Sequence, residues 1–85
     1  MNIKLKDLSH GPIYAQVREQ IEHQIRSGQI TSGHVLTSPA TLSQQLAVDR
    51  GEIQRAYFEL EHAGVVTSET VKDFLGKSRT TYRVK

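Results

Sequence analysis

The first hydrophobic repeat in the chain begins just after Gly11. Apolar side chains then recur at every fourth residue, at Ile13, Val17, Ile21 and Ile25. This spacing places them along one side of a helix. Pro12 suits the first turn of a helix, where its missing N–H is not needed, and Gly28 suits the end. We therefore expect a helix that opens at Gly11-Pro12 and ends at Gly28.

Two more helical patterns follow within residues 38–66, separated by a short corner at Ala47-Val48. In the first, Ser38 precedes Pro39, so Ser38 is expected to cap a short helix. Leu42 and Leu46 supply the apolar side of that helix.

In the second pattern, Asp49 is placed to cap a longer helix, with Glu52 three residues on as its capping-box partner. The apolar stripe inside this helix is formed by Ile53, Ala56, Tyr57 and Leu60. Gly64 suits a left-handed residue just after its end. Two short helices joined by a tight corner predict a helix-turn-helix, a unit that usually places its second helix in the DNA major groove.

The remaining segments predict short strands. We expect one at Val35-Leu36, one over residues 65–67 and a return strand over residues 79–84, with a polar loop over residues 68–78. The order α-β-α-α-β-β is typical of a winged helix-turn-helix, a mainly α fold with a small β wing. Residues 1–10 would form a loosely held leader to a domain over residues 11–85, although Ile3, Leu5 and Leu8 alternate in a way that suits docking.

Length and charge narrow the class of protein. With 85 residues and no cysteine, the chain makes one small domain that cannot rely on disulfides. It has no secretory segment and no long apolar run, which predicts a cytoplasmic protein. The net charge is only +2. The C-terminal end is nevertheless basic, because Asp73 is the single acid there among Lys72, Lys77, Arg79, Arg83 and Lys85.

From about residue 11 to residue 84, the chain resembles the N-terminal DNA-binding domain of GntR-type regulators. The resemblance is carried by Pro12-Ile13-Tyr14, Ser27-Gly28, Gly33, Leu36, Ser38, Leu42, Leu46, Ala47-Val48, Arg50, Leu60-Glu61 and Gly64-Val65-Val66. It implies a transcription regulator, which we expect to be a repressor that binds a palindromic operator in double-stranded DNA as a homodimer. Such a protein would associate with the bacterial nucleoid when bound.

An effector-binding domain normally follows the wing in this family. The resemblance therefore implies one of two arrangements. The chain is either the DNA-binding part of a larger effector-responsive regulator, or a stand-alone protein with no small-molecule effector and no cofactor.

The chain also departs from the family pattern. Family members commonly carry Glu-Arg after the capping Ser, and that Arg grips a phosphate, but here Pro39 and Ala40 occupy the two positions. The recognition helix usually begins Ser-Arg-Thr-Thr, where this chain has residues 49–52, Asp-Arg-Gly-Glu. A further family Arg falls at Gln54, next to Arg55. The wing keeps a Gly76-Lys77 pair, which resembles the glycine-tipped turn that reaches the minor groove.

These patterns give a set of candidate DNA-binding residues. We expect the helix at about 50–63 to lie in the major groove and the wing, at about 68–79, to lie on the flanking groove or backbone. Arginine suits phosphate and guanine, glutamine suits adenine, and hydroxyls suit the backbone. The candidates are Ser38, Thr41, Arg50, Gly51, Gln54, Arg55, Gly76, Lys77 and Arg79.

Other functions are less well supported by the sequence. We expect no enzyme, because no nucleophile elbow, phosphate loop or metal-binding helix pattern occurs. The four histidines have no ligand spacing, so no metal site is expected. Phe58 is an aromatic residue on an otherwise polar helix side. We expect it to tuck against the first helix or the leader; otherwise it marks a winged helix adapted to protein–protein contact.

Overall fold

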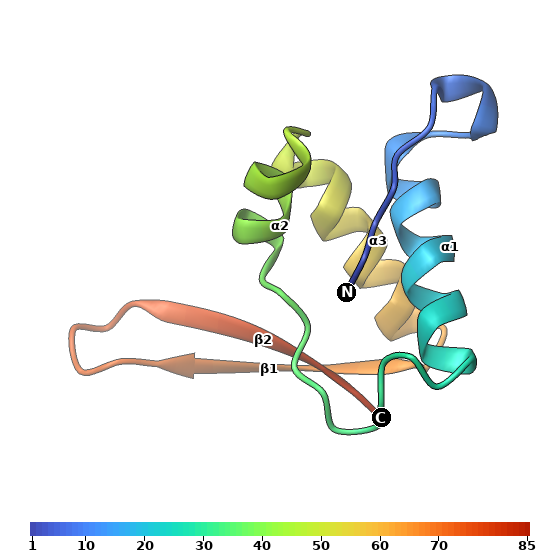
Figure 1. The fold of residues 1–85 in the computed structure, drawn as a ribbon. Coiled ribbons are helices and arrows are strands. Elements are labelled where there is room, and N and C mark those ends of the chain that lie inside the picture. Colours follow the sequence, from blue (N-terminus) through green and yellow to red (C-terminus); the bar gives the residue numbers. More distant parts are fainter.

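The computed structural model describes residues 1–85 and places a β-hairpin at the base of three packed helices (Figure 1). The helices are α1 (Ile13–Arg26), α2 (Pro39–Leu46) and α3 (Arg50–His62), and a short 3-10 turn, Leu8–His10, precedes them. The hairpin consists of β1 (Val66–Lys72) and β2 (Ser78–Val84). This is the predicted winged helix-turn-helix. None of the helices is both long enough and apolar enough to cross a membrane.

The core lies where α1, α2 and α3 meet the base of the hairpin. The predicted stripe of α3 is fully buried, and in that of α1 the two central residues are fully buried while Ile13 and Ile25 are partly buried. The hairpin contributes one residue from the start of β1 and one from the end of β2. The core residues are Val17, Ile21, Ile30, Leu36, Leu42, Ile53, Ala56, Tyr57, Leu60, Val66 and Val84.

The corner between α2 and α3 has the predicted form. Ala47 adopts the left-handed conformation with φ 56°, which ends α2 and redirects the chain. At the start of α2, Ser38 Oγ accepts a hydrogen bond from the N–H of Thr41 at 3.2 Å. At the start of α3, Asp49 Oδ2 accepts one from the N–H of Gly51 at 3.2 Å. Both predicted N-caps are confirmed.

The predicted role of Glu52 as capping-box partner of Asp49 is wrong. Its Oε2 instead accepts a hydrogen bond from the N–H of Tyr14, in the first turn of α1, at 2.8 Å. Pro12, the N-cap residue of α1, makes no side-chain cap hydrogen bond. Glu52 therefore satisfies an amide that α1 leaves unpaired and places a negative charge at the positive end of that helix.

The hairpin is longer than the sequence suggested. Its antiparallel register runs from Val66 opposite Val84 to Lys72 opposite Ser78, so most of the expected loop over residues 68–78 is strand. Both faces of this ribbon are exposed beyond its base. The strand therefore carries no apolar alternation, the sequence signal on which a strand prediction depends.

Residues 33–36 extend the base of the hairpin on the other edge of β2. Leu36 donates a backbone hydrogen bond to Tyr82, and Gly33 donates one to Val84, both at 2.8 Å. The predicted strand at Val35-Leu36 is thus reduced to a single β-bridge, between Val35 and Arg83. This bridge ties the segment that leads into α2 to the base of the wing.

Residues 1–10 are held more firmly than expected. The leader runs along α1, and the amides of Gln16, Gln20 and Gln24 hydrogen-bond to its backbone. Gln20, for example, accepts from the Lys4 N–H at 2.8 Å and donates to the Lys4 carbonyl at 2.7 Å. Four helical residues rise about 6 Å and two extended residues about 6.6 Å, so the ladder stays in register.

Candidate nucleic-acid interface

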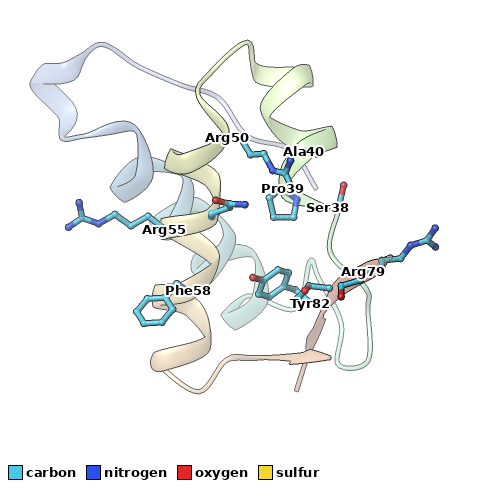
Figure 2. Close-up of a pocket in the computed structure, with 11 residues that line it drawn as sticks. Ser38, Pro39, Ala40, Arg50, Arg55, Phe58, Arg79 and Tyr82 are labelled. Atoms are coloured by element: carbon cyan, nitrogen blue, oxygen red, sulfur yellow. The ribbon is translucent and has the colours of Figure 1, made fainter. Parts of the chain in front are cut away.

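A groove of about 620 Å³ lies between the start of α2, the outer side of α3 and β2 (Figure 2). Three separate parts of the chain thus meet at one concave surface, the one a helix-turn-helix and its wing would present together. It is lined by Ser38, Pro39, Ala40, Arg50, Gln54, Arg55, Phe58, Ser78, Arg79, Thr80 and Tyr82. Five of the candidate DNA-binding residues are among them: Ser38, Arg50, Gln54, Arg55 and Arg79.

Arg50 and Gln54 occupy the first half of α3, one turn apart on its outer side. Both side chains are exposed, and neither takes part in a side-chain hydrogen bond of the fold. The salt bridges of the chain use other arginines, namely Arg18, Arg26 and Arg55. The side-chain donors of Arg50 and Gln54 are therefore available to a ligand in the groove.

The acids at the start of α3 are directed toward backbone amides. Asp49 caps α3 itself, and Glu52 caps α1. Each carboxylate is thus engaged at the positive end of a helix, which lowers its repulsion of an anionic ligand in the groove. The two carboxylates remain charged, and their hydrogen bonds fix them at helix ends.

Gly51 has a structural role as well as the predicted functional one. A Cβ built on it would lie 3.0 Å from Asp49 Oδ2, the atom that caps α3. A glycine at this position therefore lets the cap approach closely, and it also leaves the backbone of the first turn uncovered.

Arg55 points away from the other candidates. Its guanidinium carbon lies 3.7 Å from the centroid of the Tyr14 ring, a cation–π contact with α1, and its Nε lies 3.5 Å from Glu59 Oε2. Figure 2 shows Arg55 and Phe58 extending to one side of α3, while Arg50 and Arg79 lie on the other. Arg50 and Arg55 thus both line the groove but extend to different sides of α3.

Ser38 and Thr41 are coupled to each other at the start of α2. The Ser38 hydroxyl donates to Thr41 Oγ1 at 3.0 Å while it accepts from the Thr41 N–H. Ser38 lines the groove and Thr41 does not. Pro39 and Ala40, at the positions where the family resemblance led us to expect Glu-Arg, form an uncharged rim beside it.

The wing candidates lie at and near the tip of the hairpin. Gly76 has φ 82°, a conformation that favours glycine, and it allows the chain to reverse between the strands. Lys77 and Arg79 line a second, smaller hollow on the wing, and Arg79 also lines the main groove. Arg79 therefore connects the two surfaces.

Phe58 is not tucked against α1 or the leader, so that prediction is wrong. Its side chain is 57% exposed, and its ring packs edge-on against His62 at 4.8 Å between centroids. It lines the groove one turn beyond Gln54. It is the one large apolar side chain exposed on α3.

Apart from Arg79, sequence reasoning missed the residues that β2 contributes to the groove. Ser78, Thr80 and Tyr82 line it, and their period-two spacing on one strand face was the available signal. Tyr82 packs edge-on against Tyr57, with ring centroids 4.9 Å apart. Burial, followed by the charge of Glu61, raises the pKa of Tyr82 above its usual range, so its hydroxyl stays a neutral donor at the groove wall.

Buried Tyr57 holds two walls of the groove, α3 and the start of α2, in a fixed relative position. Its hydroxyl donates to the carbonyl oxygen of Thr37 at 2.6 Å, which ties α3 to the residue before the Ser38 cap. Burial, and to a smaller extent the neighbouring Tyr82, raises the pKa of Tyr57 above its usual range. No three His, Cys, Asp or Glu side chains are grouped so as to hold a metal ion.

Comparisons with known proteins agree with this geometry. The family model described as "Bacterial regulatory proteins, gntR family" matches residues 13–81. The fold is similar to that of YtrA from Sulfolobus acidocaldarius, a GntR-family transcription factor, with a TM-score of 0.73 and 28% sequence identity. That similarity covers 100% of this chain, which spans 64% of the length of the YtrA chain. No curated protein sequence matches the chain.

Two further structures similar to this chain contain DNA. They are AraR(DBD) in complex with operator ORX1, with a TM-score of 0.68 and 25% identity, and AraR(DBD) in complex with operator ORE1, with 0.68 and 26%. Each similarity covers 100% of this chain and, respectively, 93% and 94% of the AraR chain. Together with the family match over most of its length, these findings show that the chain belongs to the gntR family of bacterial regulatory proteins, as a winged helix-turn-helix DNA-binding domain.

Proposed function

We propose that the chain binds specific sequences of double-stranded DNA, with the first half of α3 in the major groove. The observation that carries this proposal is the groove in which Arg50 and Gln54 are unpaired while Asp49 and Glu52 are turned to helix ends. Arginine can donate twice to guanine, and glutamine can pair with adenine in a bidentate manner. The AraR(DBD) complexes with operator DNA support this use of the fold.

The remaining groove residues would position the domain on the duplex. Ser38 at the start of α2, Arg79 on β2 and Lys77 near the wing tip suit phosphate oxygens on either side of the major groove. Gly51, whose N–H is bound by Asp49, would let the duplex approach the first turn of α3 closely because it has no side chain. Arg55, held against Tyr14, would reach a flanking phosphate at most.

One such domain covers a short half-site, so we propose that two copies bind a palindromic operator, as a cytoplasmic repressor would. Since the chain spans 64% of YtrA, a role as the DNA-binding part of a larger effector-responsive regulator is also part of the proposal.

Selection of bound duplexes from a random pool would test this function. A shared motif should emerge, and the association constant should fall by about 0.9 log units per phosphate contact for each tenfold rise in salt. Arg50→Ala should weaken binding to the selected duplex about 10- to 100-fold and relax its preference at one base pair. Arg26→Ala is the matched control, because Arg26 is exposed, lies outside the groove and pairs only with Glu22.

The exposed Phe58 favours a second function, contact with another protein through the far half of α3. The same experiment separates the two. If no duplex is enriched, and if partner binding is insensitive to salt and lost in Phe58→Ala, the DNA-binding proposal is wrong and protein contact is the function.

A further inference from the structure

Two large apolar side chains stand exposed at the tip of the wing. Phe74 is 94% exposed and Leu75 is 70% exposed. Neither belongs to the core or packs against it. Leaving two such residues in water at the most protruding point of a small domain is unfavourable unless a partner covers them.

The turn that carries them has a fixed shape. Asp73 Oδ1 accepts hydrogen bonds from the N–H of Leu75 at 2.9 Å and from that of Lys77 at 3.0 Å. The backbone closes the turn further, because Asp73 and Lys77 are hydrogen-bonded and Gly76 donates to the Asp73 carbonyl. The two apolar side chains are therefore presented by a preformed turn.

The surroundings of the tip are cationic. Lys72 and Arg79 lie on the two strands beside it and Lys77 lies in the turn itself, while the one nearby carboxylate, that of Asp73, is occupied by backbone amides. An apolar pair framed by cations complements a surface with anionic edges and an apolar interior. A DNA groove, with phosphates at its rims and stacked bases inside, has this composition.

The length of the wing fits the distance between DNA grooves. The ribbon is anchored in the core at Val66 and Val84 and runs six residues to Lys72 opposite Ser78, about 20 Å. One turn of duplex is about 34 Å, so adjacent major and minor grooves lie about 17 Å apart. Figure 1 shows the hairpin projecting well beyond the helices, and Arg79 links its surface to the main groove.

The family resemblance already implies that the wing turn reaches the minor groove; we propose that Phe74 and Leu75, on this turn, form an apolar wedge there that partly unstacks one base step. This inference rests on the proposed function and adds a mechanism to it. Such wedges kink a duplex by about 20–90°. Since pyrimidine–purine steps unstack most easily, the wedge would select a TA or CA step that no side chain reads by hydrogen bonds.

The test compares wild type with the Phe74→Ala/Leu75→Ala variant on the duplex that wild type selects. Wild type should bend circularly permuted fragments and raise the fluorescence of 2-aminopurine placed at the flanking step. The variant should lose both signals, bind about tenfold or more weakly and no longer enrich TA or CA at that step. Its salt dependence should be unchanged, because no charge is removed.

Val71→Ala is the matched control, since Val71 is also exposed on the wing but lies on β1 and not in the turn. It should bend and bind as wild type does. The wedge is overturned if the double variant bends the duplex like wild type, or if wild type binds without bending. It is also overturned if the variant keeps DNA binding and bending but loses binding to anionic phospholipid vesicles, which would make the tip a membrane contact. If wild type binds no duplex at all, both the proposed function and the wedge proposal are wrong.

Discussion

The helical body and the wing of this domain are stabilised in different ways. In the body, apolar side chains from α1, α2 and α3 meet in one core, and buried Tyr57 adds a hydrogen bond to Thr37. The wing buries only Val66 and Val84 at its base, and beyond them it is held by the strand ladder and by the Asp73 turn. Substitutions of core residues in the body should therefore change stability, whereas substitutions at the exposed turn of the wing should change binding and leave stability unchanged.

The largest expected effect is on the core. Leu60→Ala removes a fully buried side chain of α3 and should lower the free energy of unfolding by about 2–5 kcal/mol. Val71→Ala, on the exposed ribbon, should change it by about 0.5 kcal/mol or less. Urea unfolding followed by circular dichroism measures both. Equal losses in the two variants would mean that the wing is part of the cooperative core.

The next effect concerns the carboxylate that joins α3 to α1. Glu52→Ala leaves the Tyr14 N–H without its partner and should cost about 1–2 kcal/mol, an N-cap loss in a helix that Glu52 does not belong to. Glu69→Ala, an exposed acid on β1 without a hydrogen bond, is the control. If the Glu52 variant is as stable as the control, the stabilising role of this cap is contradicted.

A smaller effect should appear at alkaline pH. Burial raises the pKa of Tyr57 above its ordinary value of 10.0. Above that pH the unfolded chain releases a proton that the folded protein keeps, so the free energy of unfolding falls as pH rises further. Below it, this group adds no pH dependence. Tyr57→Phe should show a shallower fall as the pH rises above about 10 in urea unfolding. An unchanged slope would contradict the buried, protonated state of Tyr57.

The smallest effect is expected at the wing cation nearest the tip. Lys77→Ala should weaken binding to all duplexes alike, reduce the slope of log K against log salt by about 1 and leave stability unchanged. Fluorescence titrations at several salt concentrations measure the slope. An altered base preference would instead assign Lys77 to a base edge.

The same contrast explains what the sequence could predict. Helices α1 and α3 carry a clear apolar period because one side of each is buried. Local chemistry marks the ends of the helix-turn-helix, since Ser38 and Ala47 cap α2 and Asp49 caps α3. The ribbon beyond Val66 is solvated on both faces, so Ser68, Glu69 and Thr70 read as loop. A buried face produces a regular spacing of apolar residues in the sequence. An exposed ribbon has no such spacing, so only its turn, at Asp73 to Gly76, can be predicted.

The site was predictable in part, for a related physical reason. Arg50, Gln54 and Arg79 could be assigned from residue type and helix or strand position, and the groove contains them. The contacts of Glu52 and Arg55 with Tyr14 could not be predicted, because Tyr14 lies on α1, distant from them in sequence. The glutamine ladder along α1 did have a signal, since Gln16, Gln20 and Gln24 recur every fourth residue opposite alternate leader residues.

The central claim is that the groove between α3 and the wing is the DNA-binding surface. Amide chemical-shift mapping with the selected duplex tests it most directly. We predict that the amides of residues 50–55 and 73–79 shift strongly while those of residues 22–26, at the end of α1, do not. Strong shifts at residues 22–26 with none at residues 50–55 would contradict the account.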